Sequence, residues 1–552
     1  MKNTLAAFVA TALLAGTSAY AQDKAGEIDK IFSGIKPGEP GCVVAVSRHG
    51  KLVVNRAYGS ADLERDALLT PSSIFDIGSV RKQFVAAAVL LLVEEKRLSL
   101  SDDIRRHFPE LPDYGHKITI DHLLTHTSGI RDWTGLRPLA GGNVDVLTLI
   151  LRQRGLNFAP GEEWAYSNSG YVLLTDLVAR TSGMSFPDFT RKRLFEPLGM
   201  KATTSPGDLR DVIKNRALGY EREGDGWRMG MYVGSERGSN GGAILSTAAD
   251  LVIWNDALTS GRLGAFVTEK LQEPARLNNG RKLTYARGLN VNTYSVGTLV
   301  SHSGGAAGYS AWLGRLPVQG LSIAVLCNAD VASATALAHR VADQFLPAAG
   351  AETAEPAAVA EGVTGLDLSG KAGLFFSEGA GEPLRLIVND GRLGIVGGPV
   401  LVPVTTDRFR NPRGDLFFLS QDEFELRFLS QDRFELKSME GKTTRYRRAR
   451  PYSPTTADLR AFAGRYESDE IGSVLQIVPG NDGLVMRLEL SPDRALGFRP
   501  VDPDVFQAGG MMVRFHRDKA GQVIAFDYSN PVVRSIKFTR VSDRIHGPRG
   551  RE

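Results

Sequence analysis

The stretch "DIGSVRKQFVAAAVLLLVEEKRLSL", residues 76–100, joins a short polar segment to a long apolar run. Ser79 and Lys82 lie one turn apart at this junction, and the apolar run predicts a buried helix from Ser79 to about Arg97. The N-terminus of a helix favours developing negative charge, and burial lowers the pKa of a lysine. Ser-x-x-Lys at this place therefore suits a nucleophile and its base. The structural alternative is a capping serine followed by a solvated lysine.

Two further polar groups lie beside apolar elements. "PGEEWAYSNSGYVLL" carries Tyr166 and Asn168 directly before a second apolar helix. "VSHSGGAAGYSAW" carries His302, Gly304 and Gly305 in a strand-like segment. The chain has no Gly-x-Ser-x-Gly elbow, which argues against an α/β-hydrolase.

These three groups, in this order, resemble the motifs Ser-x-x-Lys, Tyr-x-Asn and Lys- or His-x-Gly of the penicillin-recognising serine hydrolases. That family includes class C β-lactamases, DD-carboxypeptidases, esterases and D-aminopeptidase, and the resemblance covers about residues 30–346. It implies an α+β catalytic domain of the β-lactamase/DD-peptidase type, with an antiparallel sheet flanked by helices. It also implies a serine hydrolase that works through an acyl-enzyme.

The resemblance assigns roles residue by residue. Ser79 would be the nucleophile and Lys82 its base. Tyr166, as a phenolate or a proton shuttle, would protonate the leaving amine and help to activate the deacylating water. Asn168, His302, Gly304 and Gly305 would bind substrate, and the backbone N–H groups of Ser79 and Gly305 would form the oxyanion hole. His126, in "LLTHTSGI", is expected to be structural.

The sequence departs from the family's motifs at two positions. A histidine, His302, stands where β-lactamases and most DD-peptidases carry a lysine, and an ordinary histidine is largely neutral at pH 7. This weakens recognition of a carboxylate and favours the esterases and D-aminopeptidase. Arg81 lies inside the first motif, where a small polar residue is more usual. As a second cation near Lys82 it would lower the pKa of that lysine; the alternative is that its side chain points to solvent.

The C-terminal half favours D-aminopeptidase as the closest relative, because that enzyme joins a catalytic domain to two small antiparallel β-barrels. Residues 463–478, "AGRYESDEIGSVLQIV", resemble the opening of its second barrel. A loop of that barrel anchors the free amine of the substrate through an aspartate. Asp493 is the candidate here, with Asp502 and Asp504 behind it, and an ordinary solvated turn is the alternative.

Composition sets the domain boundaries. Residues 347–365 are rich in Ala, Glu and Pro, and short strands separated by turns follow them. We expect a signal peptide at 1–21, a catalytic domain at 22–346, a linker at 347–365, β-barrels at 366–450 and 454–542, and a tail at 543–552. The signal peptide rests on Lys2, an apolar run and the cleavage pattern Ala19-Tyr20-Ala21.

Export predicts a periplasmic or secreted protein. It permits a disulfide between Cys42 and Cys327, although two buried thiols are the interpretation we favour from the sequence. Two cysteines cannot make a zinc framework, so we expect no metal and no cofactor. The net charge of +4 is scattered, which excludes a nucleic-acid footprint, and no apolar run is long enough to span a membrane.

The sequence therefore predicts a serine hydrolase that releases N-terminal D-amino acids from small peptides, amides or esters. A broad esterase, a DD-carboxypeptidase or weak β-lactamase, and a non-catalytic penicillin-binding or scaffold protein are the alternatives. The sequence also permits inhibition by β-lactams and assembly into a homodimer, and it decides neither.

Overall fold

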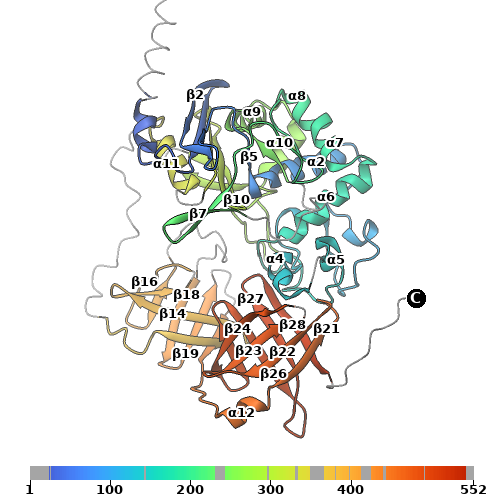
Figure 1. Cartoon of the computed structure of the whole chain (residues 1–552), viewed down its shortest axis with the longest axis vertical. Coiled ribbons are helices and arrows are strands. Elements are labelled where there is room, and N and C mark those ends of the chain that lie inside the picture. Colours follow the sequence, from blue (N-terminus) through green and yellow to red (C-terminus); the bar gives the residue numbers. More distant parts are fainter. Residues whose placement is uncertain are drawn as a thin grey trace, which may run out of the picture.

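The computed structural model describes residues 24, 26–141, 144–230, 243–294, 297–329, 333–347, 366–378, 381–396, 398–411, 424–438, 443–489 and 491–541. The chain up to about residue 347 forms one part of the molecule, and two β units lie side by side beneath it (Figure 1). The expected signal peptide at 1–21 and the tail at 543–552 lie outside the described residues, as does the expected linker apart from residue 347.

A six-stranded antiparallel sheet forms the centre of the first part. Its order is β2-β1-β12-β11-β10-β9. The strands are β1 (Cys42–Arg48), β2 (Lys51–Tyr58), β9 (Asn290–Tyr294), β10 (Gly297–Ala306), β11 (Tyr309–Leu316) and β12 (Leu321–Cys327). Strands from the two ends of this region therefore meet in one sheet.

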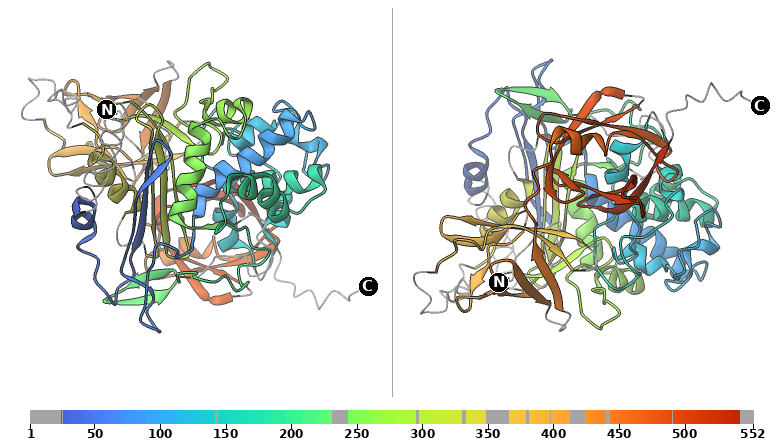
Figure 2. Two further views of the ribbon diagram at one scale, coloured as in Figure 1. Left: turned by 90° about the horizontal axis from the view of Figure 1, so that it is seen from above. Right: turned by 90° about the horizontal axis from the view of Figure 1, so that it is seen from below.

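Helices cover both faces of the sheet because its inner strands are apolar on both faces (Figure 2). Along β1, Val43 and Ala45 join the core on one side, and Val44 and Val46 join the core on the other. Helix α9 (Ala248–Thr259) packs on the first side, and α11 (Ala334–Asp343) packs on the second.

The apolar run of the opening stretch forms α2 (Lys82–Glu94), preceded by the 3-10 turn η1 (Gly78–Arg81). Helix α2 packs between α6 (Asn168–Ser182) and α10 (Ala265–Gln272), so that most of its residues are buried. The remaining elements of this region are α3 (Ile120–Leu124), α4 (Trp133–Leu136), α5 (Val146–Leu151), α7 (Phe186–Thr190), α8 (Glu196–Leu198), η2 (Ile104–Arg106), η3 (Arg137–Leu139), η4 (Arg191–Phe195), β3 (Ser60–Asp62), β4 (Ala67–Leu68), β5 (Phe75–Asp76), β6 (Tyr220–Glu223), β7 (Gly226–Met229) and β8 (Leu245–Ser246). Within the described ranges, every helix is too short or too polar to cross a membrane.

The two cysteines form a disulfide, so the expectation of two buried thiols is wrong. Cys42 and Cys327 face each other across β1 and β12, with their Cα atoms 4.0 Å apart. The bond joins residues that are 285 positions apart in the chain.

The C-terminal half consists of two eight-stranded units. The second closes into a barrel, and the first is a sheet whose end strands approach through the bridge between Gly394 and Val400. The first unit contains β13 (Gly373–Ser377), β14 (Pro383–Asn389), β15 (Arg392–Ile395), β16 (Val402–Pro403), β17 (Arg408–Arg410), β18 (Phe424–Ser430), β19 (Arg433–Ser438) and β20 (Thr443–Arg448). The second contains β21 (Gly464–Ser468), β22 (Ser473–Pro479), β23 (Leu484–Leu488), β24 (Ser491–Asp502), β25 (Val505–Ala508), β26 (Met511–Arg517), β27 (Val523–Asn530) and β28 (Val533–Val541), after the short helix α12 (Thr456–Arg460).

The closed barrel shares its core with the first part of the molecule. Leu136, Leu139 and Leu149, from the α4–α5 region, belong to the same apolar cluster as Tyr466 and Phe526 of the barrel. A barrel of this size is filled by side chains, and the leucines of the α4–α5 region extend this core. The barrel is therefore packed onto the first part and not merely tethered to it.

Candidate active site

Ser79 and Lys82 meet at the start of α2. The Lys82 Nζ lies 3.1 Å from the Ser79 Oγ and 2.9 Å from the Asn168 Oδ1. Ser79 lies within η1, which has no side-chain cap bond, so the capping alternative does not describe it. Lys82 is fully buried, which also excludes a solvated lysine.

Burial lowers the pKa of Lys82 well below its usual value, because the charged ammonium loses its hydration. The neighbouring Arg81 lowers that pKa further, as the sequence predicts, and Asp132 opposes the shift. A lysine with a lowered pKa offers a neutral amine that can accept the proton of a serine hydroxyl.

Tyr166 lies against this amine. The Lys82 Nζ is 4.5 Å from the centroid of the Tyr166 ring. Burial raises the pKa of Tyr166, and its hydrogen bond with Ser79 and the charge of Arg81 act against that rise. The resting phenol is therefore protonated, which suits a proton shuttle and does not suit a standing phenolate.

Asn168 is the first residue of α6, and a buried aspartate fixes its orientation. The Asp132 carboxylate accepts hydrogen bonds from the Asn168 backbone N–H and, at 3.1 Å, from the Asn168 Nδ2. The Asn168 Oδ1 is thereby turned toward Lys82. The sequence analysis missed Asp132; its one signal is an N-cap position, because the Asp132 Oδ1 accepts from the Thr134 N–H at the start of α4.

Glycines let strand β10 run directly beside Ser79. A Cβ atom at Gly304 would lie 2.1 Å from the Ile77 carbonyl oxygen and 2.9 Å from the Ser79 nitrogen. A Cβ atom at Gly78, whose φ is +51°, would lie 2.6 Å from the Gly305 nitrogen. The structure therefore brings Ser79, Gly304 and Gly305 together through backbone contact that any larger residue would prevent.

His302 lies on the same strand but has both ring nitrogens engaged. Its Nδ1 donates to the Ser303 carbonyl oxygen at 2.6 Å, and its Nε2 lies 3.1 Å from the Tyr285 hydroxyl. Burial, aided by the charge of Lys82, lowers the pKa of His302 from 6.5 to about 3. His302 is therefore neutral at pH 7, as the third motif predicts.

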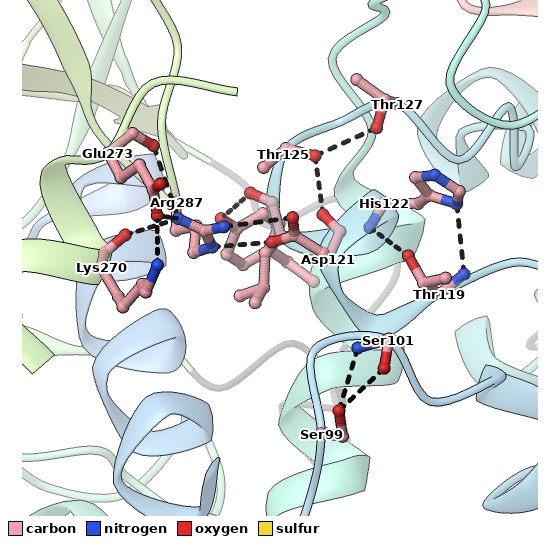
Figure 3. A network of polar contacts seen from close by, with 12 residues as sticks. Ser99, Ser101, Thr119, Asp121, His122, Thr125, Thr127, Lys270, Glu273 and Arg287 are labelled. Carbon is pink, nitrogen blue, oxygen red and sulfur yellow. Dashed lines mark hydrogen bonds and ion pairs between the residues drawn. The ribbon is translucent and has the colours of Figure 1, made fainter. Parts of the chain in front are cut away.

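A polar network ties the segments behind the site together (Figure 3). The buried Arg287 donates to both oxygens of Asp121, at 2.7 and 3.1 Å, and to the Lys270 carbonyl oxygen at 2.7 Å. Thr125 donates to the Asp121 carbonyl oxygen at 2.6 Å, one residue before His126. The network thus clamps the His126 segment to the segment that carries Tyr285.

The barrel aspartates have different positions. The side chain of Asp493 lies outside the described residues. Asp502 is almost fully buried and pairs with Arg447 and Arg450. Asp504 pairs with Arg517 of its own barrel. Both carboxylates are thus engaged by arginines, which leaves Asp493 as the candidate for the amine anchor.

The closed barrel reaches the site through its β27–β28 turn. The Asn530 Nδ2 donates to the Gly135 carbonyl oxygen at 2.9 Å, and the Val532 carbonyl oxygen accepts from Asp132 N–H at 3.4 Å. On the adjacent β21–β22 turn, Glu470 forms an ion pair with the buried Arg131. Two turns of the barrel therefore contact the segment that carries Asp132.

Among the described residues, no group of three or more His, Cys, Asp or Glu side chains could hold a metal ion.

Comparison with known proteins identifies the family of this chain. The family model described as Beta-lactamase matches residues 19–345. Penicillin-binding protein 4* of Bacillus subtilis (strain 168) is 32% identical over 324 residues, which are 53% of this chain and 69% of that protein. The D-aminopeptidase of Brucella melitensis biotype 2 (strain ATCC 23457) is 25% identical over 532 residues, which are 91% of this chain and 96% of that protein.

Among solved structures, the crystal structure of SurE aligns with a TM-score of 0.52 and 20% identity, over 78% of this chain and 99% of that chain. This likeness concerns the fold alone. The family match covers more than half of the sequence and contains all three motifs. The chain belongs to the beta-lactamase family.

Proposed function

We propose that the protein is an exported serine hydrolase that releases N-terminal D-amino acids from peptides, amides or esters through an acyl-enzyme. One observation carries the choice of substrate. The Brucella D-aminopeptidase matches 91% of this chain, which includes both barrel units, whereas the Bacillus penicillin-binding protein matches 53%. This chain and the Brucella enzyme thus match over the catalytic domain and both barrel units, which favours the same role for the barrels in both proteins.

The chemistry follows from the contacts of Lys82. Its neutral amine takes the Ser79 hydroxyl proton, and the Ser79 Oγ attacks the substrate carbonyl carbon. The backbone N–H groups of Ser79 and Gly305 donate to the oxyanion that develops. Tyr166 passes a proton to the leaving amine as the carbon–nitrogen bond breaks. Water then attacks the ester on Ser79 and releases the amino acid.

The substrate side is built from Asn168, His302, Gly304 and Asp493 in this proposal. Asp493 would pair with the free ammonium of an N-terminal residue. Topology supports this role, because alternate turns of an antiparallel barrel lie at the same end. The β23–β24 turn, next to Asp493, therefore shares its end with the β21–β22 and β27–β28 turns, and both of these contact the catalytic part.

Export is part of the proposal. The disulfide between Cys42 and Cys327 supports it, because disulfides persist in oxidising compartments such as the periplasm and the extracellular space. N-terminal sequencing of the protein from a periplasmic or culture fraction should then begin at Gln22. A chain retained in the cytoplasm with Met1 in place would contradict export.

The deciding assay compares D-alanine p-nitroanilide with its L-isomer, its N-acetylated form and p-nitrophenyl acetate. We expect activity on the free-amine D-substrate and its loss in Ser79→Ala. Cleavage of the ester alone would instead support a broad esterase. Release of D-alanine from an acyl-D-Ala-D-Ala peptide would support a DD-carboxypeptidase. Intact-mass detection of a penicillin adduct on Ser79 tests inhibition by β-lactams, and light scattering tests a homodimer.

A further inference from the structure

A continuous set of hydrogen bonds joins the second motif to the third. The Ser167 backbone N–H donates to the His126 Nδ1 at 3.1 Å. The His126 Nε2 lies 3.1 Å from the Tyr285 hydroxyl, which lies 3.1 Å from the His302 Nε2. The His302 Nδ1 ends the series at the Ser303 carbonyl oxygen, 2.6 Å away. His126, Tyr285 and His302 are all almost fully buried.

The two ends of this series fix the direction of every proton. His126 Nδ1 must accept, because a backbone N–H can only donate, so the proton of neutral His126 lies on Nε2. His302 Nδ1 must donate, because a carbonyl oxygen can only accept. Tyr285 then accepts from His126 and donates to His302 Nε2. A proton added to His302 Nε2 would oppose the Tyr285 proton and would leave the buried Tyr285 hydroxyl as the acceptor of two N–H groups.

The surroundings of His302 also oppose its protonation. Burial lowers the pKa of His302, and Lys82, on α2, lowers it further when it is protonated. The Tyr166 ring centroid, beside α6, lies 6.3 Å from that of His302. No carboxylate within the described ranges forms an ion pair with His302 or His126, although other ion pairs are present throughout this part of the chain. The ring thus has no anionic partner that would stabilise its charged form.

Tyr285 is held in place by its neighbours in the chain. Arg287, two residues later, makes the bidentate ion pair with Asp121 that Figure 3 shows. A Cβ atom at Gly288, whose φ is +74°, would lie 2.7 Å from the Lys82 carbonyl carbon, so this segment also packs directly on the start of α2. The Tyr285 hydroxyl is therefore fixed with respect to both Lys82 and His126.

We propose that Tyr285 and His126 are positioning residues that hold His302 as the neutral Nδ1–H tautomer, so that the enzyme prefers acyl donors with uncharged leaving groups. The preference for uncharged leaving groups rests on the proposed function, whereas the tautomer of His302 does not. Amides, esters and longer peptides have no charged group next to the scissile bond and are therefore the preferred substrates. A dipeptide places its free carboxylate next to the scissile bond, where β10 then offers it no cation.

The tautomer is tested first, by ¹⁵N NMR of the wild-type protein labelled in its histidines, with His302→Asn to assign the signal. We expect a protonated Nδ1 and an unprotonated Nε2 for His302 throughout pH 5–8. A protonated Nε2, or a charged ring at pH 7, would overturn the proposal. This measurement does not depend on activity, so the tautomer can stand even if hydrolysis of D-aminoacyl substrates is not found.

The role of Tyr285 is tested by Tyr285→Phe against Tyr466→Phe. Tyr466 is the matched control, because it is also buried and its hydroxyl donates to a backbone carbonyl oxygen, that of Phe462, in the closed barrel. In Tyr285→Phe we expect the His302 signal to shift toward the Nε2–H or charged form. We also expect the kcat/KM ratio of D-alanine amide to D-alanyl-D-alanine to fall at least fivefold. Tyr466→Phe should leave the signal and the ratio as in wild type.

If both variants, or neither, change the signal and the ratio, the assignment of Tyr285 is refuted. His302→Lys gives a second test that leaves Tyr285 intact. It should raise relative activity on the dipeptide about tenfold, because it restores a cation on β10. An unchanged ratio in this variant would refute the link between His302 and the leaving group.

Discussion

The two buried histidines should make the catalytic part sensitive to mild acid. In the folded protein, burial lowers the pKa of His302 to about 3 and that of His126 well below its usual value. In the unfolded chain, each titrates near 6.5. Below pH 6.5 the unfolded state therefore binds protons that the folded state refuses, and the free energy of unfolding falls as the pH falls.

The size of the effect follows from linkage. Each such histidine changes the free energy of unfolding by about 1.4 kcal/mol per pH unit between its two pKa values. For His302 the window runs from pH 6.5 down to about 3, and the loss between pH 7 and pH 5 is about 2 kcal/mol. His126 adds a loss in the same direction.

Urea unfolding followed by tryptophan fluorescence measures this loss. All five tryptophans lie before residue 346, so the signal reports the catalytic part. We expect wild type to lose about 2 kcal/mol more than His302→Asn between pH 7 and pH 5. His116→Gln is the control, because the His116 side chain is exposed and should leave the wild-type slope intact. Equal slopes in wild type and His302→Asn would refute the reasoning.

Other predictions concern the nucleophile and the sheet. Arg81→Thr removes a charge that lowers the pKa of Lys82, so the acidic limb of the pH profile of kcat/KM should move to higher pH. Arg81→Lys keeps the charge and should leave this limb where it is in wild type. If the limb does not move in either variant, the role of Arg81 is structural only. Gly304→Ala should lower kcat/KM about 100-fold or more with folding retained in circular dichroism, because its Cβ would displace the backbone at Ser79. Replacing Cys42 and Cys327 by Ser should cost about 2–5 kcal/mol in urea unfolding, and no change would argue against the bond.

Local patterns predicted much of the fold. The hairpin of β1 and β2 turns at His49 and Gly50, both with positive φ, and a glycine at such a turn is a local signal in the sequence. The helix predicted from Ser79 begins as an α-helix only at Lys82, since the chain first passes through a 3-10 turn pressed against β10. Sequence periodicity cannot express that contact, because its partner lies more than 200 residues away.

The parts of the site that sequence could not provide are those made by distant contacts. Asp132 and Tyr285 lie in irregular segments and gain their roles only from Asn168 and His302, which other elements supply. The disulfide was missed for the same reason, because only the register of β1 with β12 brings its two cysteines together. The pairing of Ser79 with Lys82 could be predicted from the sequence, since one helical turn is enough to bring them together.

The shared core of the closed barrel and the α4–α5 region has a consequence for how the protein is made. On the ribosome, Leu136 and Leu149 emerge long before Tyr466 and Phe526, against which they pack. Until the last strands are synthesised, these leucines lack their final neighbours, and the nearby Asp132 lacks the turn that docks beside it. The surroundings of Asp132 are therefore completed only when residues near the end of the chain have folded against it, which ties the onset of activity to the presence of the whole chain.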